Sequence, residues 1–309
     1  MYKYTQEIRD FINKPRKQFR LLKNQRLWNQ LCSSLDVIED CDLAMDAYIN
    51  GEFGENDGEK YLRLYGVLQA LFVQQDAVVT LCESLGLPNN LTSHPKLREI
   101  RDVRNDSIGH PTKRGNSKSY HFISRDNITK SRFQLISDYG NNQTTFRDIS
   151  VIDLLREQRK YLSEILKNVI NVLKAEEKAY KEKFKMEKLE TVFPNNFLYY
   201  IEKVFRSIGK SEYAKFGLIN IKLVEKLMDE LRESLKRKGI EIDTYDSIKY
   251  LYELLEYPIM ELKLYFNKLI DGEKPRITDK TAYIFAYFIK DRLYQLKEIA
   301  KEIDDEYSS

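Results

Sequence analysis

One short segment combines a permanent cation with a group that titrates near neutrality. Arg104 and His110 are separated by five residues, and the helix expected over 95–108 ends at Gly109. A glycine at position 109 permits a left-handed helix cap, and Pro111 prevents the helix from resuming, so His110 lies where the backbone turns off the helix end. An arginine can neutralise a phosphate while a histidine moves protons. The pair therefore suits phosphoryl chemistry.

A structural interpretation of the same residues stays open. A histidine at a helix C-terminus interacts favourably with the helix dipole, by about 0.3–1 kcal/mol. Arg104 would then pair with Asp102 or Asp106 at the surface. Of the two other histidines, His94 precedes a proline and is interpreted as part of a helix N-cap. His121 is interpreted as a surface residue of a strand, close enough in sequence to the motif to contact a ligand.

The Arg104–His110 segment resembles the signature of the HEPN superfamily. That signature is an arginine, a polar residue directly after it, and a histidine after four to six intervening residues. Arg104, Asn105 and His110 match it. Long predicted helices precede the motif, and another follows it over 151–184. The resemblance covers about residues 1–185 and implies a mainly α fold, a HEPN-like helical bundle.

In catalytic members of that family the motif forms a metal-independent endoribonuclease site, and the resemblance implies a role for each residue. His110 would take the proton from a ribose 2′-hydroxyl or deliver one to the leaving 5′-oxygen. Arg104 would hold the scissile phosphate and stabilise its developing charge. Asn105 would orient the histidine or the phosphate by hydrogen bonding. The substrate would be RNA, one product would carry a 2′,3′-cyclic phosphate, and no metal or other cofactor is implied.

HEPN ribonuclease sites are composite, with two motifs facing each other, and this chain contains one Arg-to-His motif. We therefore expect a homodimer in which two copies of helix 95–109 meet across a two-fold axis. Some HEPN toxins carry a tyrosine two residues after the histidine, where a nucleotidyltransferase antitoxin modifies them. Thr112 stands there instead, so an adenylylating antitoxin is not implied, although another regulatory protein stays open.

The charge of the chain is concentrated next to the motif. The whole chain carries a formal net charge of +3, and residues 101–150 contain nine basic and five acidic side chains, a net charge of 9 − 5 = +4. A basic loop beside a histidine suits RNA binding, although a solvated hairpin would have the same composition. The predicted RNA-binding residues are Lys113, Arg114, Lys118, Arg125, Lys130 and His121.

The elements that must position these residues are mainly helices. Apolar residues at 3-4 spacing predict helices over 17–49, 59–85, 95–108 and 151–184, and Gln158 is the one polar member of the last stripe. Residues typical of β-strands, divided by turn residues, interrupt the predicted helices near 118–149. We expect two or three short strands there, which form a small β-hairpin insertion. These elements make a first domain over residues 1–185.

Residues 186–309 are expected to form a second, all-helical domain of unknown role. Helical segments are predicted at 196–208, 213–238, 244–271 and 279–304, with Pro258 kinking or splitting the third. The many tyrosines, phenylalanines and lysines suit amphipathic helices around a core rather than a ligand site.

Several other classes of protein are excluded by composition. The first twenty residues hold six basic side chains and no apolar run, so we expect no secretory signal peptide, and no apolar run approaches the roughly 18 residues of a membrane span. The three cysteines are interpreted as reduced core thiols of a cytoplasmic protein, not metal ligands. No Walker, dinucleotide-binding, serine-hydrolase or zinc-protease motif occurs.

Three functions remain. The first is a HEPN-type endoribonuclease of a prokaryote, serving antiviral defence or acting as a toxin that controls growth. The second is a catalytically inactive HEPN scaffold that binds RNA or a protein partner. The third is a helical adaptor recognised through its tyrosine-rich second half.

Overall fold

The chain forms two compact units, Met1–Lys174 (unit 1) and Ala175–Ser309 (unit 2). The computed structural model describes every residue except 89–93, 110, 113–118, 141–142, 195 and 309. The division falls inside helix α6 (Val151–Phe184), not between residues 185 and 186. The core of unit 1 receives residues of α6 only as far as Leu173, and beyond it Tyr180 packs on Tyr307 of unit 2, with ring centroids 5.8 Å apart.

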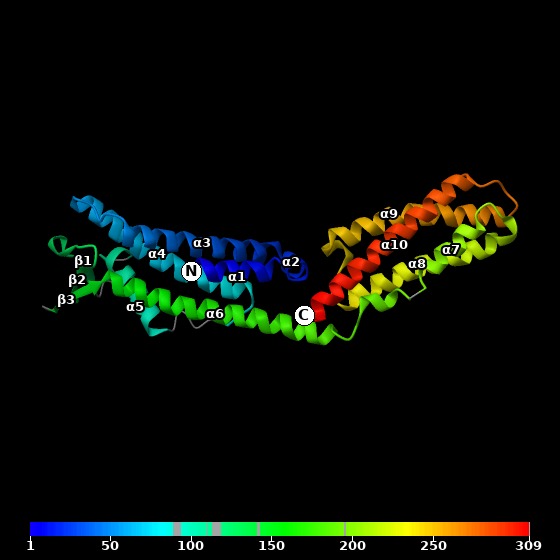
Figure 1. Cartoon of the computed structure of the whole chain (residues 1–309). Coiled ribbons are helices and arrows are strands. Elements are labelled where there is room, and N and C mark those ends of the chain that lie inside the picture. Colours follow the sequence, from blue (N-terminus) through cyan, green and yellow to red (C-terminus); the bar gives the residue numbers. More distant parts are fainter. Residues whose placement is uncertain (89–93, 110, 113–118, 141–142, 195, 309) are drawn as a thin grey trace. The chain divides into compact units, whose positions relative to one another are not determined.

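Unit 1 is a bundle of helices, as predicted (Figure 1). Besides α6 its helices are α1 (Tyr2–Ile12), α2 (Pro15–Leu22), α3 (Gln25–Asn50), α4 (Asp57–Ser84) and α5 (Pro95–Arg104). The predicted helix over 17–49 is in fact two helices, because Asn24 interrupts it. The side-chain oxygen of Asn24 accepts a hydrogen bond from the backbone N–H of Leu27 at 3.2 Å and caps α3.

Three buried glutamines connect the helices of unit 1. Gln158 of α6 donates to the side-chain oxygen of Gln74 at 3.0 Å and accepts from the amide nitrogen of Gln75 at 2.8 Å. Gln158 also donates to the backbone oxygen of Leu71, and Gln74 donates to that of Ile38. None of the three glutamines is exposed to solvent. The polar exception in the α6 stripe is therefore a core residue that hydrogen bonds to α4.

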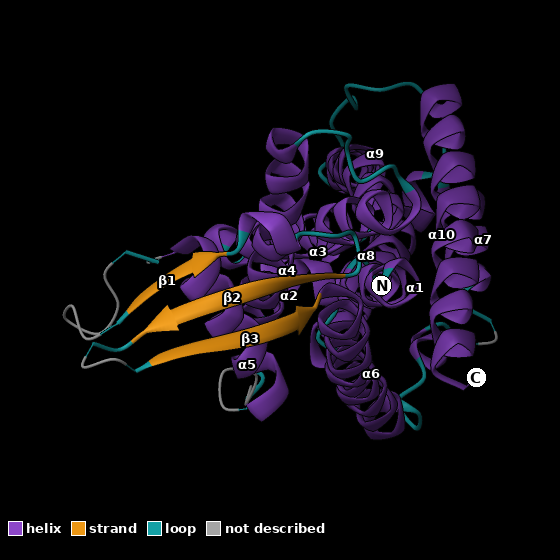
Figure 2. Cartoon of the chain, turned by 90° about the vertical axis from the view of Figure 1, so that its left-hand side faces the viewer, coloured by secondary structure: helices purple, strands orange, loops and turns teal. Residues whose placement is uncertain are grey.

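The predicted β insertion is a three-stranded antiparallel sheet with strands in the order β1-β2-β3 (Figure 2). The strands are β1 (Tyr120–Ile123), β2 (Arg132–Asp138) and β3 (Thr144–Ser150). One face of the sheet packs Phe133, Leu135 and Ile149 into the core of unit 1. The hydroxyl of Tyr48 in α3 donates to the backbone oxygen of Lys130 at 2.9 Å, so α3 holds the connection between β1 and β2.

Unit 2 is all helical within the described residues. Its helices are α7 (Leu198–Ser207), α8 (Ala214–Arg237), α9 (Asp246–Ile270) and α10 (Asp279–Ser308). The expectation that Pro258 could split the third helix is wrong, because α9 is continuous and buries Pro258 together with Ile259 and Leu262. Gly217 of α8 allows close packing here: a Cβ atom at this position would lie 2.5 Å from the ring of Phe266.

Among the described residues one helix, α4, is long and apolar enough to cross a membrane by length and composition alone. Of its most apolar window, 56% is buried inside the protein. The buried residues include Gln74 and Gln75, whose side chains hydrogen bond to other helices of unit 1. Packing of α4 as the central helix of this core accounts for its apolar composition.

Candidate functional site

Helix α5 places two arginines against α4. Its apolar residues Leu97, Ile100 and Val103 are buried in the core of unit 1. Since these residues occupy one face of the helix, Arg101 and Arg104 lie along its side, where both guanidiniums pack on the ring of Phe72 of α4. Arg104 is the last residue of α5.

The guanidinium of Arg104 is held by neutral groups. Its Nε and Nη2 atoms both donate to Oε1 of Gln69, at 3.1 and 2.8 Å, and its Nη1 atom donates to Oδ1 of Asn105 at 3.0 Å. The Cζ atom lies 4.2 Å from the centroid of the Phe72 ring, within the range of a cation–π interaction. Among the described residues no carboxylate forms an ion pair with Arg104, so its positive charge remains available to a ligand.

Arg101 differs from Arg104 because a carboxylate lies beside its guanidinium. Its Nη1 atom lies 2.6 Å from Oδ1 of Asp76, and its Cζ atom lies 4.1 Å from the centroid of the Phe72 ring. The two arginines share one aromatic ring, but a carboxylate neutralises only Arg101. The surface pairing of Arg104 with Asp102 or Asp106, the structural alternative, is not formed.

The residues after Arg104 form a single π-helical turn, Asn105–Gly109 (the π-turn). Gly109 does not adopt the left-handed conformation that a glycine permits, because its φ is not positive. A glycine is required there for a different reason. A Cβ atom at position 109 would lie 2.7 Å from Nη1 of Arg104 and 3.1 Å from Oδ1 of Asn105. The π-turn thus brings its last residue against the arginine, and such turns occur frequently at functional sites.

His121 is a buried residue, and the expectation of a surface histidine is wrong. The residue is 5% exposed because it lies on the core side of β1. Its Nε2 atom is 2.9 Å from the hydroxyl of Ser119, and its Nδ1 atom is 2.8 Å from that of Ser137. Nε2 also lies 3.9 Å from Oδ1 of Asp106 in the π-turn. The ring of His121 is therefore buried between these two serines and the π-turn.

Of the basic residues predicted to bind RNA, the structure describes Arg125 and Lys130, and both lie beyond the far end of β1. The chain enters β1 near the motif, where the backbone N–H of His121 donates to the oxygen of Pro111 at 2.7 Å. Arg125 is exposed in a turn after the strand, and the ammonium of Lys130 donates to the backbone oxygen of Gly51 at 2.8 Å. Lys130 therefore serves the connection between α3 and α4. Outside the described residues lie His110, Lys113, Arg114 and Lys118.

The sequence does not single out the side chains of α4 that hold Arg104. Gln69 and Phe72 are separated by three positions, so they share one face of that helix. The sequence signal is a glutamine on the half-exposed side of a largely apolar stretch of this helix, and such a residue usually contacts solvent. Their function follows only from the packing of α5 on α4.

His94 and two cysteines are the other described groups of unit 1 whose surroundings can be compared with this site. His94 is the N-cap residue of α5, as predicted, although its side chain makes no capping hydrogen bond. Instead, the ring packs on Tyr161, with centroids 4.0 Å apart. Burial raises the pKa of Cys41 and of Cys82 to about 11, which keeps both as thiols. In the part of the chain that the structure describes, no three His, Cys, Asp or Glu side chains gather to hold a metal ion.

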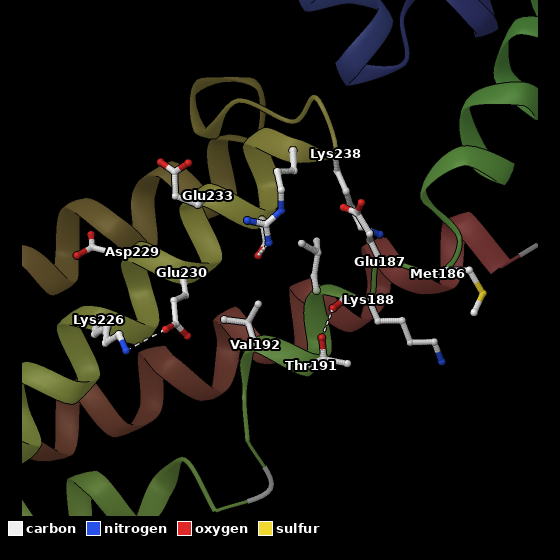
Figure 3. A pocket seen from close by; sticks show the side chains of 13 residues that line it. Met186, Glu187, Lys188, Thr191, Val192, Lys226, Asp229, Glu230, Glu233 and Lys238 are labelled. Carbon is white, nitrogen blue, oxygen red and sulfur yellow. Dashed lines mark hydrogen bonds and ion pairs between the residues drawn. The ribbon is translucent and has the colours of Figure 1, made fainter.

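Unit 2 contains an open cavity of about 710 Å³ between α8 and the segment 186–192 (Figure 3). Its rim carries charges of both signs, and Lys226 and Glu230 pair across 3.5 Å. At its inner wall lies Lys238, whose ammonium is 3.0 Å from Oδ1 of Asp304 and fully buried with it. Asp304 also accepts the backbone N–H of Leu189, so these charges hold the fold together. The lining contains no histidine or cysteine that could act as a nucleophile or base.

No protein-family model, no curated protein and no solved structure matches this chain. The surroundings of Arg104 therefore carry the functional argument by themselves.

Proposed function

We propose that the protein is a HEPN-type, metal-independent endoribonuclease, of the kind that prokaryotes use in defence or as toxins. The observation that supports the proposal is that, among the described residues, uncharged groups alone hold the guanidinium of Arg104 in place. Its guanidinium is fixed by Gln69, Asn105 and Phe72, none of which is charged. A preorganised cation without a counter-charge favours the additional negative charge of a phosphoryl transition state, because nothing has to be displaced or reoriented when that charge develops.

The reaction would proceed by transesterification within the RNA chain. The 2′-oxygen forms a bond to phosphorus while the bond from phosphorus to the 5′-oxygen breaks, which leaves a 2′,3′-cyclic phosphate. One histidine takes the 2′-proton, and a second histidine gives a proton to the 5′-oxygen. In this proposal His110 fills one role and its copy in a second chain fills the other. Arg104 binds the phosphate oxygens, and Asn105 fixes the position of Arg104.

A homodimer would supply the second motif, and the surface of α4 beside Arg104 suits this contact. Leu62 and Tyr65 are 74% and 42% exposed, and nothing lies within 4 Å of a Cβ atom built at Gly66. These residues are one to two turns from Gln69, which holds Arg104. Exposed apolar side chains on an accessible helix surface favour a contact between copies.

The ribonuclease activity is tested with total RNA and transfer RNA in EDTA, using the parent protein, Arg104→Ala and His110→Ala. The matched control is Arg101→Ala, which removes an arginine from the same helix and the same ring but one that Asp76 already neutralises. We expect cleavage by the parent and by Arg101→Ala, with cyclic phosphate ends, and none by the other two variants. Equal loss in Arg101→Ala and Arg104→Ala would contradict the specific role of Arg104.

The dimer is tested by sedimentation of Leu62→Glu at micromolar concentration. Leu43→Glu on α3 is the control, because Leu43 is 69% exposed but lies on another helix. We expect a dimer for the parent and for Leu43→Glu, and a monomer without cleavage activity for Leu62→Glu. A parent that is strictly monomeric would exclude the composite site. RNA binding without cleavage would instead identify an inactive scaffold, and indifference to RNA a helical adaptor.

A further inference from the structure

An open groove of about 490 Å³ runs between α8 and α9 of unit 2 (the α8–α9 groove). An ion pair lies at each of its ends. Lys263 of α9 pairs with Glu225 of α8 at 2.8 Å, and Lys249 of α9 pairs with Asp243, which precedes that helix, at 3.4 Å. The two lysines are fourteen positions apart, so the groove extends along about 21 Å of α9.

The floor of the α8–α9 groove is apolar. Met228 of α8 lines it together with Tyr252 and Ile259 of α9, and all three residues are buried. The hydroxyl of Tyr252 donates to the backbone oxygen of Met228 at 2.7 Å, which ties the two helices to each other. A side chain that enters the groove would therefore meet an apolar surface that is already in place.

The walls between the two ion pairs carry an excess of negative charge. Asp229 of α8 and Glu253 and Glu256 of α9 line the groove (the three carboxylates), and all are exposed. Within the part of the chain that the structure describes, none of them has an ion pair. The other charge between the ends is Arg232, whose Cζ atom lies 5.2 Å from the ring centroid of Tyr252. Three carboxylates thus face one guanidinium.

An exposed apolar stripe of α9 borders the groove. Its residues are Tyr250, Tyr257, Met260 and Leu264 (the α9 stripe), which are 60%, 49%, 47% and 47% exposed. The two tyrosines and the leucine recur every seven positions, and Met260 completes the 3-4 spacing and also lines the groove. An exposed stripe of this spacing suits the packing of another helix against it.

The charge of this surface indicates the chemistry of its partner. Asp246 lies one turn before Tyr250 on the same side of α9, so the groove and the stripe together carry six acidic and three basic side chains, a net charge of 3 − 6 = −3. A nucleic acid or an anionic membrane would be repelled. Two copies meeting through this surface across a two-fold axis would bring their carboxylates together, which is also unfavourable. The surface therefore fits a partner with positive charge.

We propose that the α8–α9 groove and the α9 stripe bind a basic amphipathic helix of a partner protein. The apolar side chains of that helix pack on the α9 stripe, and its lysines or arginines pair with the three carboxylates. The 21 Å of α9 correspond to about four turns of such a helix. A small polycation would neutralise the carboxylates but leave the stripe exposed, so the contribution of the stripe distinguishes the two. The inference is independent of the proposed ribonuclease activity.

The test measures the anisotropy of a fluorescein-labelled peptide of about four helical turns, with leucines at 3-4 spacing and lysines elsewhere, in about 0.15 M salt with the full chain. We expect Glu253→Lys/Glu256→Lys and Tyr250→Ala/Leu264→Ala each to weaken binding at least about tenfold.

Matched controls keep the composition but change other surfaces of unit 2. Glu202→Lys/Glu212→Lys makes the same change of charge at two exposed residues outside the groove. Tyr294→Ala removes a tyrosine of α10 that is 52% exposed, close to the exposure of Tyr250. Both controls should bind the peptide like the parent.

Three results would overturn the proposal. The first is peptide binding by Glu253→Lys/Glu256→Lys that equals the parent's, or an equal loss in its charge control, since either would show that the groove is not the site. The second is equal binding of a peptide with serines in place of the leucines, which would leave only attraction to a small or unstructured polycation. The third is a parent dimer, seen by sedimentation, that dissociates in Tyr250→Ala/Leu264→Ala, which would assign the stripe to a second copy.

Discussion

Gln69 and Arg104, thirty-five positions apart in the chain, meet through a forked hydrogen bond in which one amide oxygen accepts two guanidinium donors. An amide oxygen fixes the plane of the guanidinium as a carboxylate would, but it adds no negative charge. The orientation of the arginine and its electrostatic potential are therefore set by different groups. This separation allows each to be changed independently.

Gln69→Glu should neutralise Arg104 without moving it. We expect the affinity for a 2′-O-methyl RNA, which cannot be cleaved because its 2′-oxygen is blocked, to fall about tenfold. The reason is that a phosphate must then compete with a fixed carboxylate for Arg104. Gln69→Ala removes the acceptor but leaves the charge, so its affinity should fall less, while cleavage slows through loss of orientation. Anisotropy and single-turnover cleavage would separate the two effects. Tighter RNA binding by Gln69→Ala than by the parent would contradict an orienting role.

Gly109→Ala should displace the guanidinium while leaving the fold intact. The added methyl group would meet the end of the flexible Arg104 side chain at 2.7 Å, which can move aside at little cost in stability. We expect an unchanged melting temperature and a cleavage rate reduced by at least about tenfold.

Gly66→Ala is the paired control for this substitution. Position 66 is in the middle of α4 with open space around its Cβ direction, so alanine should raise the free energy of unfolding by about 0.5–1 kcal/mol. Thermal melts of both variants and a cleavage assay would check the pair. A large drop in melting temperature for Gly109→Ala would show that the turn itself, not the arginine, needs glycine.

Gln158→Leu should strongly destabilise unit 1. It leaves the oxygen of Gln74, the amide nitrogen of Gln75 and the backbone oxygen of Leu71 each without one partner in a fully buried environment. We expect a loss of about 2–4 kcal/mol in the free energy of unfolding, measured by urea denaturation. Asn168→Leu, an exposed amide on the same helix, should change it by less than about 0.5 kcal/mol. Equal effects would argue against the buried network.

The thiols predict a stability loss at alkaline pH. Burial raises the pKa of Cys41 and Cys82 from 9.0 to about 11. Between these values the unfolded chain releases thiol protons that the folded chain keeps. The free energy of unfolding should therefore fall as the pH rises from about 9 to 11, and these thiols should not change it below about pH 9. Unfolding curves across this range would check the sign, and a stability that rises there would contradict it.

Thiol reactivity provides a second readout of the same burial. Cys32 is only half-buried, and burial is also the main cause of its raised pKa, ahead of the opposing charge of Arg9. At about pH 8 a thiol reagent should therefore modify Cys32 first, and Cys32→Ser should abolish the rapid phase. Simultaneous reaction of all three cysteines in the folded protein would contradict the packing of α3 and α4.

The local sequence predicts most of the helices and the β insertion, because these elements depend on the spacing of apolar residues within them and on the turn residues that flank them. The interruption at Asn24 is missed, since an amphipathic stripe continues across it and only the capping side chain marks the break. Pro258 does not split its helix, because burial of its neighbours keeps α9 continuous. In both cases a contact in the folded protein, and not the local pattern of residues, decides whether the helix continues.

The site is predictable only in part for the same reason. The motif identifies Arg104 and Asn105, but the state of Arg104 depends on Gln69 and Phe72, which belong to a different helix. His121 is assigned to the surface because a strand of four residues does not reveal which of its sides faces the core. The side is set by the pairing of His121 with Ser137, a contact that arises only when the strands associate.

The π-turn also gives the length of the motif a structural meaning. A π-helical turn is equivalent to one residue inserted into an α-helix, accommodated by widening the helix locally. A related chain with an ordinary α-helical turn would therefore reach the position of Gly109 with one residue fewer after its arginine. Differences in motif spacing among such chains would then record gain or loss of the bulge, and alignments that place gaps freely within Asn105–Gly109 would match them better than alignments that forbid gaps there.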